Sequence, residues 1–335
     1  MRFGKFFRRF IVYPGICCGG VLVYDQYTSQ RIIRNVRANW VMFRLIYEYK
    51  FNWDDNDLNS DLHRRCATII LDLCRKNGGL YVKFGQGIAS MNHILPKEYN
   101  EVFQVLHDKA PSVEYKDIKQ IILDDLKVDP NVIFKEFDKK PIASASIAQV
   151  HKARLHSGEE VAVKIQKPYI QAQVPWDLFC YRILLHIVQY AFDLPLVWSA
   201  EFTEQQMLKE TDFIQEAMNS QKTQQLLNEN INIFDYPSKF QREYNIDFIK
   251  RNEIYFNKYI KNDYLKKHIH VPKLYPQYCS KRILTAEWCD GVKVNDIVSI
   301  KKMGYNFSDI MHAVVSLFGY QIFVSGLLHC DPHPG

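Results

Sequence analysis

The chain has 335 residues, of which 47% are hydrophobic and 24% charged, and it contains eight cysteines. These values exclude a disordered chain and a small disulfide scaffold, and they allow one large or two ordinary domains. The net charge is +6, but residues 1–50 alone hold nine basic and two acidic side chains. Because the basicity belongs to one end of the chain, we expect no protein-wide nucleic-acid surface and no nucleic-acid partner.

The first 24 residues combine four cations with an apolar run over residues 10–24. That run has 15 residues, fewer than the roughly 20 that span a bilayer as a helix. Segments rich in arginine and poor in acids are typical of organelle targeting. We therefore expect residues 1–27 to be a targeting and membrane-anchor segment that places the protein at the mitochondrial inner membrane. A secretory signal peptide and a buried helix with basic flanks are the alternatives.

Helical periodicity dominates the next part of the chain. Apolar residues recur at spacings of three and four over residues 28–49, which predicts a helix. Further helices are predicted over residues 62–76, ending at Gly78-Gly79, and over residues 114–126. The eight cysteines form no C-x-x-C pair, so we expect unpaired, mostly buried thiols in a reducing compartment.

Strand patterns first appear near Phe134. Residues 146–154 and 160–166 are separated by a turn at residues 156–158, so together they predict an antiparallel hairpin. A further strand is predicted over residues 282–288.

The second half of the chain is expected to be mostly helical. A long helix is predicted over residues 201–230, and another over residues 308–325. The latter is apolar nearly all round, so we expect it to be buried. Residues 232–267 are rich in Asn, Tyr, Lys and Ile without a clear period, and we interpret them as an inserted loop.

The stretch over residues 160–166 holds the first candidate for chemistry. On a strand, Val161, Val163 and Ile165 share one face, while Ala162 and Lys164 share the other. A lysine on the inner face of a half-buried strand is costly unless it has an anionic partner, such as a phosphate or a carboxylate. The VAVK pattern is similar to the lysine strand of protein kinases, and a surface edge strand is the alternative.

Acidic residues follow in the helix predicted over residues 201–230. Asp212, Glu216 and Asn219 are spaced at i, i+4 and i+7 and share one face, whereas Glu210 faces roughly the opposite way. Taken alone, this pattern is typical of a solvated acidic face. A lysine that needs a partner favours a functional role instead.

The last nine residues, LLHCDPHPG, place Asp331 in a proline-rigid loop. Such a residue can accept a hydroxyl proton or hydrogen-bond a metal-bound water. A metal site built from His329, Asp331 and His333 is an alternative, but no second cluster at ligand spacing supports it, so we expect no metal ligands among these residues. A proline turn without chemistry is the remaining interpretation.

Six motifs, in order over residues 28–335, resemble the UbiB/AarF family, the aarF-domain-containing atypical kinases. They are KxGQ at Lys83 to Gln86, the alanine-rich loop and strand at residues 144–151, the lysine strand at residues 161–164, ExD at Glu210 and Asp212, the hinge at residues 285–291, and the catalytic-loop phrase at residues 329–335. The N-terminal region looks most like the mitochondrial eukaryotic branch of this family.

The resemblance implies an α+β protein-kinase-like fold, with an antiparallel small-lobe sheet and helices. It implies a helical extension over residues 28–133 that carries the KxGQ motif, and a kinase-like domain over residues 134–335. It also implies ATP as the bound cofactor. Lys164 would hold the nucleotide phosphates with Glu216 as its helix partner, and Asp331 would be the catalytic-loop aspartate.

The resemblance implies further roles around the nucleotide. Ala143, Ser144, Ala145 and Ser146 would replace the glycine-rich loop, and Glu287 and Cys289 would border adenine through backbone groups. Regulatory positions over the active site, which would exclude protein substrates, are Lys83, Gln86, Glu210 and Asp212. The family is linked to coenzyme Q and lipid homeostasis in mitochondria, which implies a membrane lipid or small lipid-like substrate and mitochondrial membrane protein partners.

No G-x-G-x-x-G lies between Phe137 and Lys164. An alanine/serine loop cannot approach phosphates through its backbone as freely as glycine, so nucleotide affinity or selectivity should differ from an ordinary kinase. Two features depart from the family pattern: the insertion over residues 232–267, and the absence from this sequence of the metal-binding Asn that follows the position of Gly335 in the family and of the later DFG-type Asp.

We therefore expect a truncated chain that lacks most of the large lobe and has no Mg-dependent ATP hydrolysis of its own, with Mg²⁺ used only by a full-length form. One alternative is a catalytically inactive, pseudokinase-type interaction or scaffold protein. Another is a membrane-associated structural protein whose motifs are relics.

Overall fold

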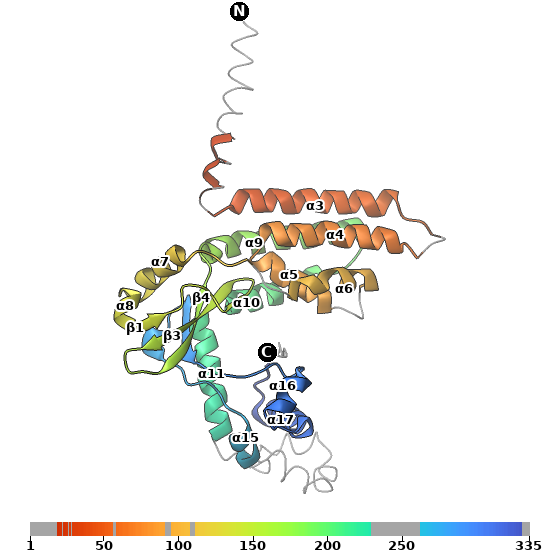
Figure 1. Ribbon diagram of the computed structural model, residues 1–335. Coiled ribbons are helices and arrows are strands. Elements are labelled where there is room, and N and C mark those ends of the chain that lie inside the picture. The colour runs from red at the N-terminus through yellow and green to blue at the C-terminus, as the bar shows by residue number, and fades with distance from the viewer. Residues whose placement is uncertain are drawn as a thin grey trace, which may run out of the picture. The chain divides into compact units, whose positions relative to one another are not determined.

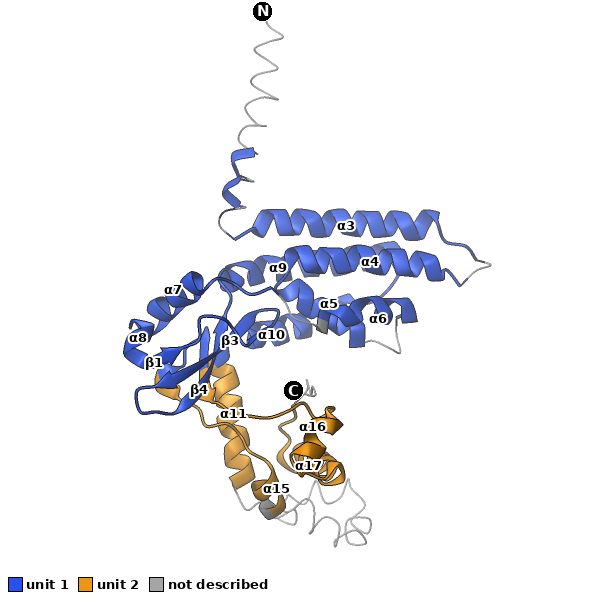
Figure 2. Cartoon of the chain, viewed as in Figure 1, with its two compact units in different colours: residues 1–213, 278–284 blue, residues 214–277, 285–335 orange. Residues whose placement is uncertain are grey.

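The computed structural model describes residues 19–329 apart from 22, 26, 28, 56–57, 91–94, 108–110 and 229–261 (Figure 1). It divides into two compact units, residues 1–213 with 278–284 and residues 214–277 with 285–335 (Figure 2). The predictions for residues 1–18, for most of the insertion and for Asp331 lie outside the described residues.

The first unit contains a layer of helices. Its members are α3 (Arg31–Phe51), α4 (Ser60–Asn77), α5 (Leu80–Ser90), α6 (Lys97–Phe103), a 3₁₀ turn (Gln104–His107), α9 (Ile170–Phe192) and α10 (Ala200–Glu210). The helices predicted over residues 28–49 and 62–76 are confirmed as α3 and α4. At the end of α4, Gly78 adopts a φ of +64°, a backbone conformation that favours glycine. No sequence pattern had predicted α9.

The same unit contains an antiparallel sheet. Its strands are β1 (Phe134–Phe137), β2 (Ala143–Ser144), β3 (Ala148–Leu155), β4 (Glu160–Gln166) and the start of β5 (Ile283–Glu287), whose residues 285–287 are assigned to the second unit. The strand order is β1-β3-β4-β5, with β2 also pairing with β3. The β3–β4 hairpin confirms the prediction, and β4 has the predicted bounds. Val161, Val163 and Ile165 are fully buried, so the alternation of β4 sets its core face.

Two short helices precede the sheet. The predicted helix over residues 114–126 is α7 (Tyr115–Leu126), and α8 (Pro130–Ile133) follows it. Buried Ile118 and Ile122 form part of the core side of α7. Near the end of α7, Asp125 accepts a hydrogen bond from Arg282 Nε at 3.0 Å and another from Ser280 Oγ at 2.7 Å. These contacts join α7 to the turn that leads into β5.

The prediction of one long helix over residues 201–230 is wrong. The chain instead forms α10 and α11 (Phe213–Asn228), which Thr211 and Asp212 separate. The Thr211 carbonyl accepts hydrogen bonds from Gln166 Nε2 at 3.2 Å and Gln171 Nε2 at 2.9 Å. Those side chains satisfy a carbonyl that a continuous helix would bond to its own backbone, which explains the break.

The second unit holds α11, α15 (Asn262–His268), α16 (Ile297–Lys302) and α17 (Phe307–Tyr320), which a π-helical turn (Gln321–Ser325) extends. The helix predicted over residues 308–325 is confirmed, and Gly326 follows it with a φ of +66°. Residues 262–267, the last of the expected insertion loop, are helical and form most of α15. A small core joins Leu227, Leu265, Tyr320 and Val324.

The expected burial of this last helix is wrong for the described residues. By length and composition alone, the stretch Phe307–Ser325 could cross a membrane, and 22% of its apolar 18-residue window is buried. Val315, Ile322 and Phe323 are all exposed. A helix that is apolar on all sides can be buried on all sides, but the pattern alone does not show what covers each side.

Candidate functional site

The lysine strand and the alanine-rich loop are aligned across the sheet of the first unit. Ala143 of β2 pairs with Val150 of β3, and Val150 pairs with Lys164 of β4. Directly paired residues point to the same face of a sheet. The loop and the lysine therefore share one face, two strand spacings apart, or about 10 Å.

Lys164 does not lie on the core face of its strand, contrary to the expectation of an inner-face lysine. It is half-buried on the opposite face, because Val161, Val163 and Ile165 occupy the core side. Its Nζ lies 4.7 Å from the ring centroid of Phe213, which is fully buried. This cation–π contact holds the ammonium at the edge of the core.

Backbone and side-chain bonds fix the loop of residues 143–146. The Ala145 N–H donates to the Ala148 carbonyl at 2.8 Å, and Ser144 Oγ donates to the Pro111 carbonyl at 3.0 Å. Ser146, the last residue of the loop, is buried. Unlike a glycine-rich loop, this loop is tied to the preceding segment through a side chain.

Sequence reasoning missed one residue at this loop. Lys167 Nζ donates to the Ala145 carbonyl at 2.6 Å and to the Pro111 carbonyl at 2.8 Å. Burial lowers the pKa of Lys167 to about 8. The available signal was its place three residues after Lys164, just past the end of a buried strand.

The KFGQ motif lies on α5, and its residues point to two different neighbours. Lys83 Nζ lies 3.4 Å from Glu210 Oε1, at the end of α10, so the structure brings these two predicted residues together. Gln86 Nε2 donates to the Leu106 carbonyl at 2.9 Å. A Cβ at Gly85 would lie 2.3 Å from Leu106 Cδ1. Gly85 and Gln86 therefore pack α5 against the 3₁₀ turn, whereas Lys83 contacts Glu210 of the ExD segment.

The helix break changes the interpretation of the acidic residues. Glu210 is the last residue of α10, and Asp212 lies between the two helices. Asp212 and Glu216 are thus not successive positions on one continuous helix face, as the spacing had predicted. Glu216 lies in the first turn of α11, in the other unit, and its pairing with Lys164 stays a prediction.

In the second unit, Glu287 of the predicted hinge makes polar contacts with Lys273 and His270. The Glu287 N–H donates to the Lys273 carbonyl at 2.8 Å, and its carboxylate accepts from the Lys273 N–H at 3.0 Å. His270 Nε2 lies 2.9 Å from the same carboxylate. The Lys273 N–H and His270 lower the pKa of Glu287.

Cys289 is exposed next to this group. Partial burial, followed by the charges of Glu287 and Asp290, raises the pKa of its thiol. The ligand atoms of His270, Glu287 and Cys289 all lie within 4.8 Å of one another, a donor set that the sequence analysis did not predict because its members are far apart in the chain. Among the five cysteines described, Cys66, Cys74 and Cys180 are buried, which confirms the expectation of mostly buried thiols.

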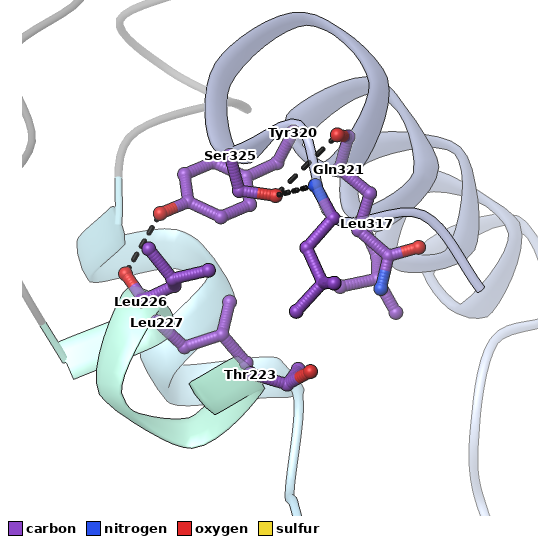
Figure 3. Close-up of a pocket in the computed structure, with 8 residues that line it drawn as sticks. Thr223, Leu226, Leu227, Leu317, Tyr320, Gln321 and Ser325 are labelled. Atoms are coloured by element: carbon purple, nitrogen blue, oxygen red, sulfur yellow. Dashed lines mark hydrogen bonds between the residues drawn. The ribbon is translucent and has the colours of Figure 1, made fainter. Parts of the chain in front are cut away.

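A cavity in the second unit is too small for a ligand. Figure 3 shows its lining, where Tyr320 donates its hydroxyl to the Leu226 carbonyl at 2.7 Å. Its volume is about 10 Å³, which is about the space of one water molecule. This cavity belongs to the packing of α11 against α17.

Comparisons with known proteins agree with the motifs. The family model described as the ABC1 atypical kinase-like domain matches residues 105–238 and 238–335. The chain is 32% identical over 335 residues to the ABC1 family protein C10F6.14c of Schizosaccharomyces pombe, covering 99% of this chain and 56% of that protein. It is 38% identical over 312 residues to the probable serine/threonine-protein kinase abkD of Dictyostelium discoideum, covering 91% and 40%.

A vertebrate relative and a solved structure complete the comparison. AarF domain-containing protein kinase 1 of Gallus gallus is 33% identical over 321 residues, covering 96% of this chain and 52% of that protein. The chain thus spans about half the length of these curated relatives. A solved structure of an Rv3197–erythromycin complex from Mycobacterium tuberculosis has a TM-score of 0.48 and 22% identity to this chain, covering 84% of this chain and 63% of that one.

The expected family and fold class are confirmed. The family model covers well over half of the chain, and the structure combines helices with an antiparallel sheet, consistent with an α+β kinase-like fold. The chain belongs to the ABC1 atypical kinase-like family, whose members include the AarF domain-containing kinases.

Proposed function

We propose that this chain carries the nucleotide-handling part of an ATP-dependent atypical kinase or ATPase. The observation that carries the proposal is the register that aligns Ala143, Val150 and Lys164 across three strands. It places a fixed loop and a half-buried ammonium on one face of the sheet. A polyphosphate that crosses this face would meet both.

The residues present fit the phosphates of ATP. The Lys164 ammonium would contact the phosphates directly, and the loop of residues 143–146 would border them on the same face of the sheet. Lys167 holds that loop by binding its carbonyl at Ala145. The Cβ atoms of the loop keep its backbone further from the phosphates than glycines would, so Lys164 bears more of the phosphate recognition.

Other predicted roles complete the proposal. The backbone of Glu287 and Cys289 would border adenine, and Glu216 would orient Lys164. Asp331, which is outside the described residues, would accept the proton of the attacking hydroxyl in phosphoryl transfer. Mg²⁺ would neutralise the phosphates in a protein that also carries the metal-binding Asn and DFG-type Asp expected from the family.

The substrate and location belong to the same proposal. A lipid or small lipid-like substrate at the mitochondrial inner membrane fits the basic, apolar N-terminal sequence. The Lys83–Glu210 ion pair supports a role of the KFGQ helix in covering the ExD segment. Such a cover would exclude protein substrates more than small molecules. A role in coenzyme Q or lipid homeostasis is the family-level expectation.

The proposal is tested by titrating the full chain with a fluorescent ATP analogue, using Lys164→Met. Loss of one charge-assisted contact should weaken binding by about tenfold or more. Lys152→Met is the matched control: Lys152 lies on the same sheet face, pairs in register with Ala162, and its Nζ contacts Glu160 at 2.8 Å. The control should change affinity less than about twofold.

Equal affinities for the two variants and the unmodified chain would contradict the proposal. A thermal melt of each variant separates lost binding from lost folding. Binding that depends on Lys164, with no hydrolysis in a chain that includes the metal ligands, would favour the scaffold alternative. In such an extended chain, Asp331→Ala should abolish ATP hydrolysis while leaving nucleotide binding in place.

A further inference from the structure

The outer face of α3 is an apolar stripe that is largely exposed in the described part of the chain. Its members recur every three or four positions and all are exposed: Ile32, Val36, Trp40, Phe43, Tyr47 and Phe51. The side chains of α3 that are buried, Arg34, Ala38 and Leu45, lie on the opposite side. Such a stripe normally faces the core of a soluble protein, so its exposure here needs an explanation.

A second helix continues the same surface. Trp176, Phe179 and Ile183 of α9 are exposed, and together with Val36, Trp40 and Phe43 of α3 they line a groove of about 430 Å³. Both helices belong to the first unit. The apolar surface is therefore a joint feature of α3 and α9, which we call the α3–α9 face.

A buried ion pair fixes the two helices that form this face. Arg34 Nε donates to Asp177 Oδ1 at 3.1 Å, and Arg34 Nη2 contacts Asp177 Oδ2. The side chains are 2% and 1% exposed. Arg34 also donates to the carbonyl of Asn77, at the end of α4. The groove is thus part of a defined packing arrangement.

Positive charge flanks the face on α3. Apart from Arg34, which Asp177 neutralises, α3 has Arg37, Arg44 and Lys50 beside the stripe against the single acid Glu48, whereas Arg31 lies toward the opposite side and its Nε is buried. The charged residues of α9 are Asp177 and Arg182, and Arg182 pairs with Glu204. Lys50 Nζ lies 5.8 Å from the ring centroid of Phe192. Apolar and aromatic side chains with cations around them are the composition of surfaces that bind anionic lipid.

We propose that the α3–α9 face docks on an anionic phospholipid surface. Trp40, Phe43, Trp176 and Phe179 would enter the boundary between headgroups and acyl chains, and the cations of α3 would meet the headgroup phosphates. The charge favours lipid over a second copy of the chain, because two copies joined through this face would bring like charges together. The inference goes beyond the nucleotide proposal, since none of the residues assigned to nucleotide binding lies on this face.

Vesicle flotation of the full chain tests the proposal. The vesicles would be phosphatidylcholine alone, or phosphatidylcholine with 30 mol% cardiolipin. Wild type should bind the anionic vesicles about tenfold more tightly than the neutral ones. The double variant Trp40→Ser/Phe179→Ser should weaken binding to anionic vesicles by about tenfold or more.

The matched control is Trp198→Ser/Phe202→Ser. These two aromatic residues are 82% and 66% exposed, compared with 71% and 61% for Trp40 and Phe179, and neither lines the groove. The control should bind vesicles within about twofold of wild type. Because all four residues are exposed, both variants should keep the thermal melting behaviour of wild type.

Charge is tested separately with Arg37→Gln/Arg44→Gln. This variant should lose about tenfold in affinity for anionic vesicles at low salt and approach wild type in 0.5 M salt, where surface charges are screened.

Two results would overturn the proposal. One is unchanged vesicle binding by the Trp40/Phe179 variant, which would assign binding to the apolar N-terminal run or another segment. The other is a wild-type oligomer that becomes monomeric in that variant while vesicle binding stays unchanged, which would assign the face to a second copy. Lys164→Met should leave vesicle binding unchanged, and Trp40→Ser/Phe179→Ser should leave nucleotide affinity unchanged, so the two proposals fail independently.

Discussion

The helical layer and the sheet of the first unit are stabilised in different ways. The sheet depends on alternation within a hairpin: Val161, Val163 and Ile165 are fully buried on one side of β4. The layer has an apolar core of its own, and it also contains a buried ion pair between residues 143 positions apart, Arg34 and Asp177. A local pattern therefore specifies the sheet, whereas the helical layer adds a long-range polar contact to its apolar packing.

The difference has an energetic consequence. A strand face of aliphatic side chains loses stability gradually as methyl groups are removed. Removing one partner of a buried ion pair causes a large loss of stability in a single step, because the other charge stays buried without compensation. Substitutions in the two regions should therefore differ in size and in how far a second substitution can rescue them.

The largest effect is expected at the ion pair. Asp177→Ala should destabilise the protein by about 3–5 kcal/mol, because it leaves the Arg34 guanidinium buried and unpaired. The double variant Arg34→Met/Asp177→Leu should recover most of that loss. Urea unfolding measures both, with Lys76→Ala at the exposed Lys76–Asp72 pair as a control that costs under about 0.5 kcal/mol. A double variant as unstable as the single would show that the charge pair itself is required.

The next effect concerns the close approach of α5. Gly85→Ala should cost about 1–3 kcal/mol, because the new Cβ would overlap with Leu106. Gly87→Ala, on the same helix, has no atom within 4 Å of the new Cβ and should stabilise by about 0.5–1 kcal/mol. Opposite signs in thermal melts would support the packing role of Gly85, and equal effects would contradict it.

A smaller, pH-dependent effect is expected where α7 meets the sheet. Although burial acts to raise it, hydrogen bonds from Arg282 and Ser280 lower the pKa of Asp125. The carboxylate therefore stabilises the fold above its unfolded pKa of about 4, and this contribution is lost as the pH falls through the lowered folded value. Asp125→Asn should cost about 1–2 kcal/mol at pH 7 and much less at pH 2.

The control for this prediction is the neighbouring acid. Asp124 is half exposed and 4.0 Å from Arg282, so Asp124→Asn should change stability by less than about 0.5 kcal/mol at either pH. Urea unfolding at pH 7 and at low pH separates the two acids. A cost of Asp125→Asn that does not depend on pH would contradict the assigned ion pair.

The smallest effect is expected for the half-exposed contact of the KFGQ motif. Lys83→Met should change stability by under about 1 kcal/mol, because solvent screens the pair with Glu210. A much larger loss in the urea midpoint would mean that this pair is structural in the same sense as Arg34–Asp177. Glu210→Gln should have the same small effect, and the double variant should show weak coupling.

The sequence predicted the sheet better than the helical layer for a physical reason. A strand alternates with period two, so the bounds of β4 and the sets of residues that share a face could be predicted, although Lys164 was wrongly expected on the inner face. The break at Thr211 could not be predicted, because it depends on Gln166 and Gln171, which reach that carbonyl from other elements. The exposure of the Trp40 stripe could not be predicted either, since periodicity identifies a face without naming its neighbour.

The motifs predicted part of the candidate site. They identified Lys83 and Glu210, which the structure brings into contact, and Lys164, which it aligns with the loop at Ala143. They did not identify Lys167, because its partners are two backbone carbonyls, which a pattern of side chains cannot indicate. Family resemblance thus located the chemical groups, whereas the supporting contacts required the structure.

The buried face of β4 also protects the hairpin against errors in strand pairing. If β4 shifted by one residue against β3, every side chain would move to the opposite face of the sheet. Lys164 would then enter the core, and Val163 would move to the solvated side. Such a slipped hairpin would lose its aliphatic burial and bury a charge at the same time. The slipped register, in which Lys164 faces the core, is therefore disfavoured during folding.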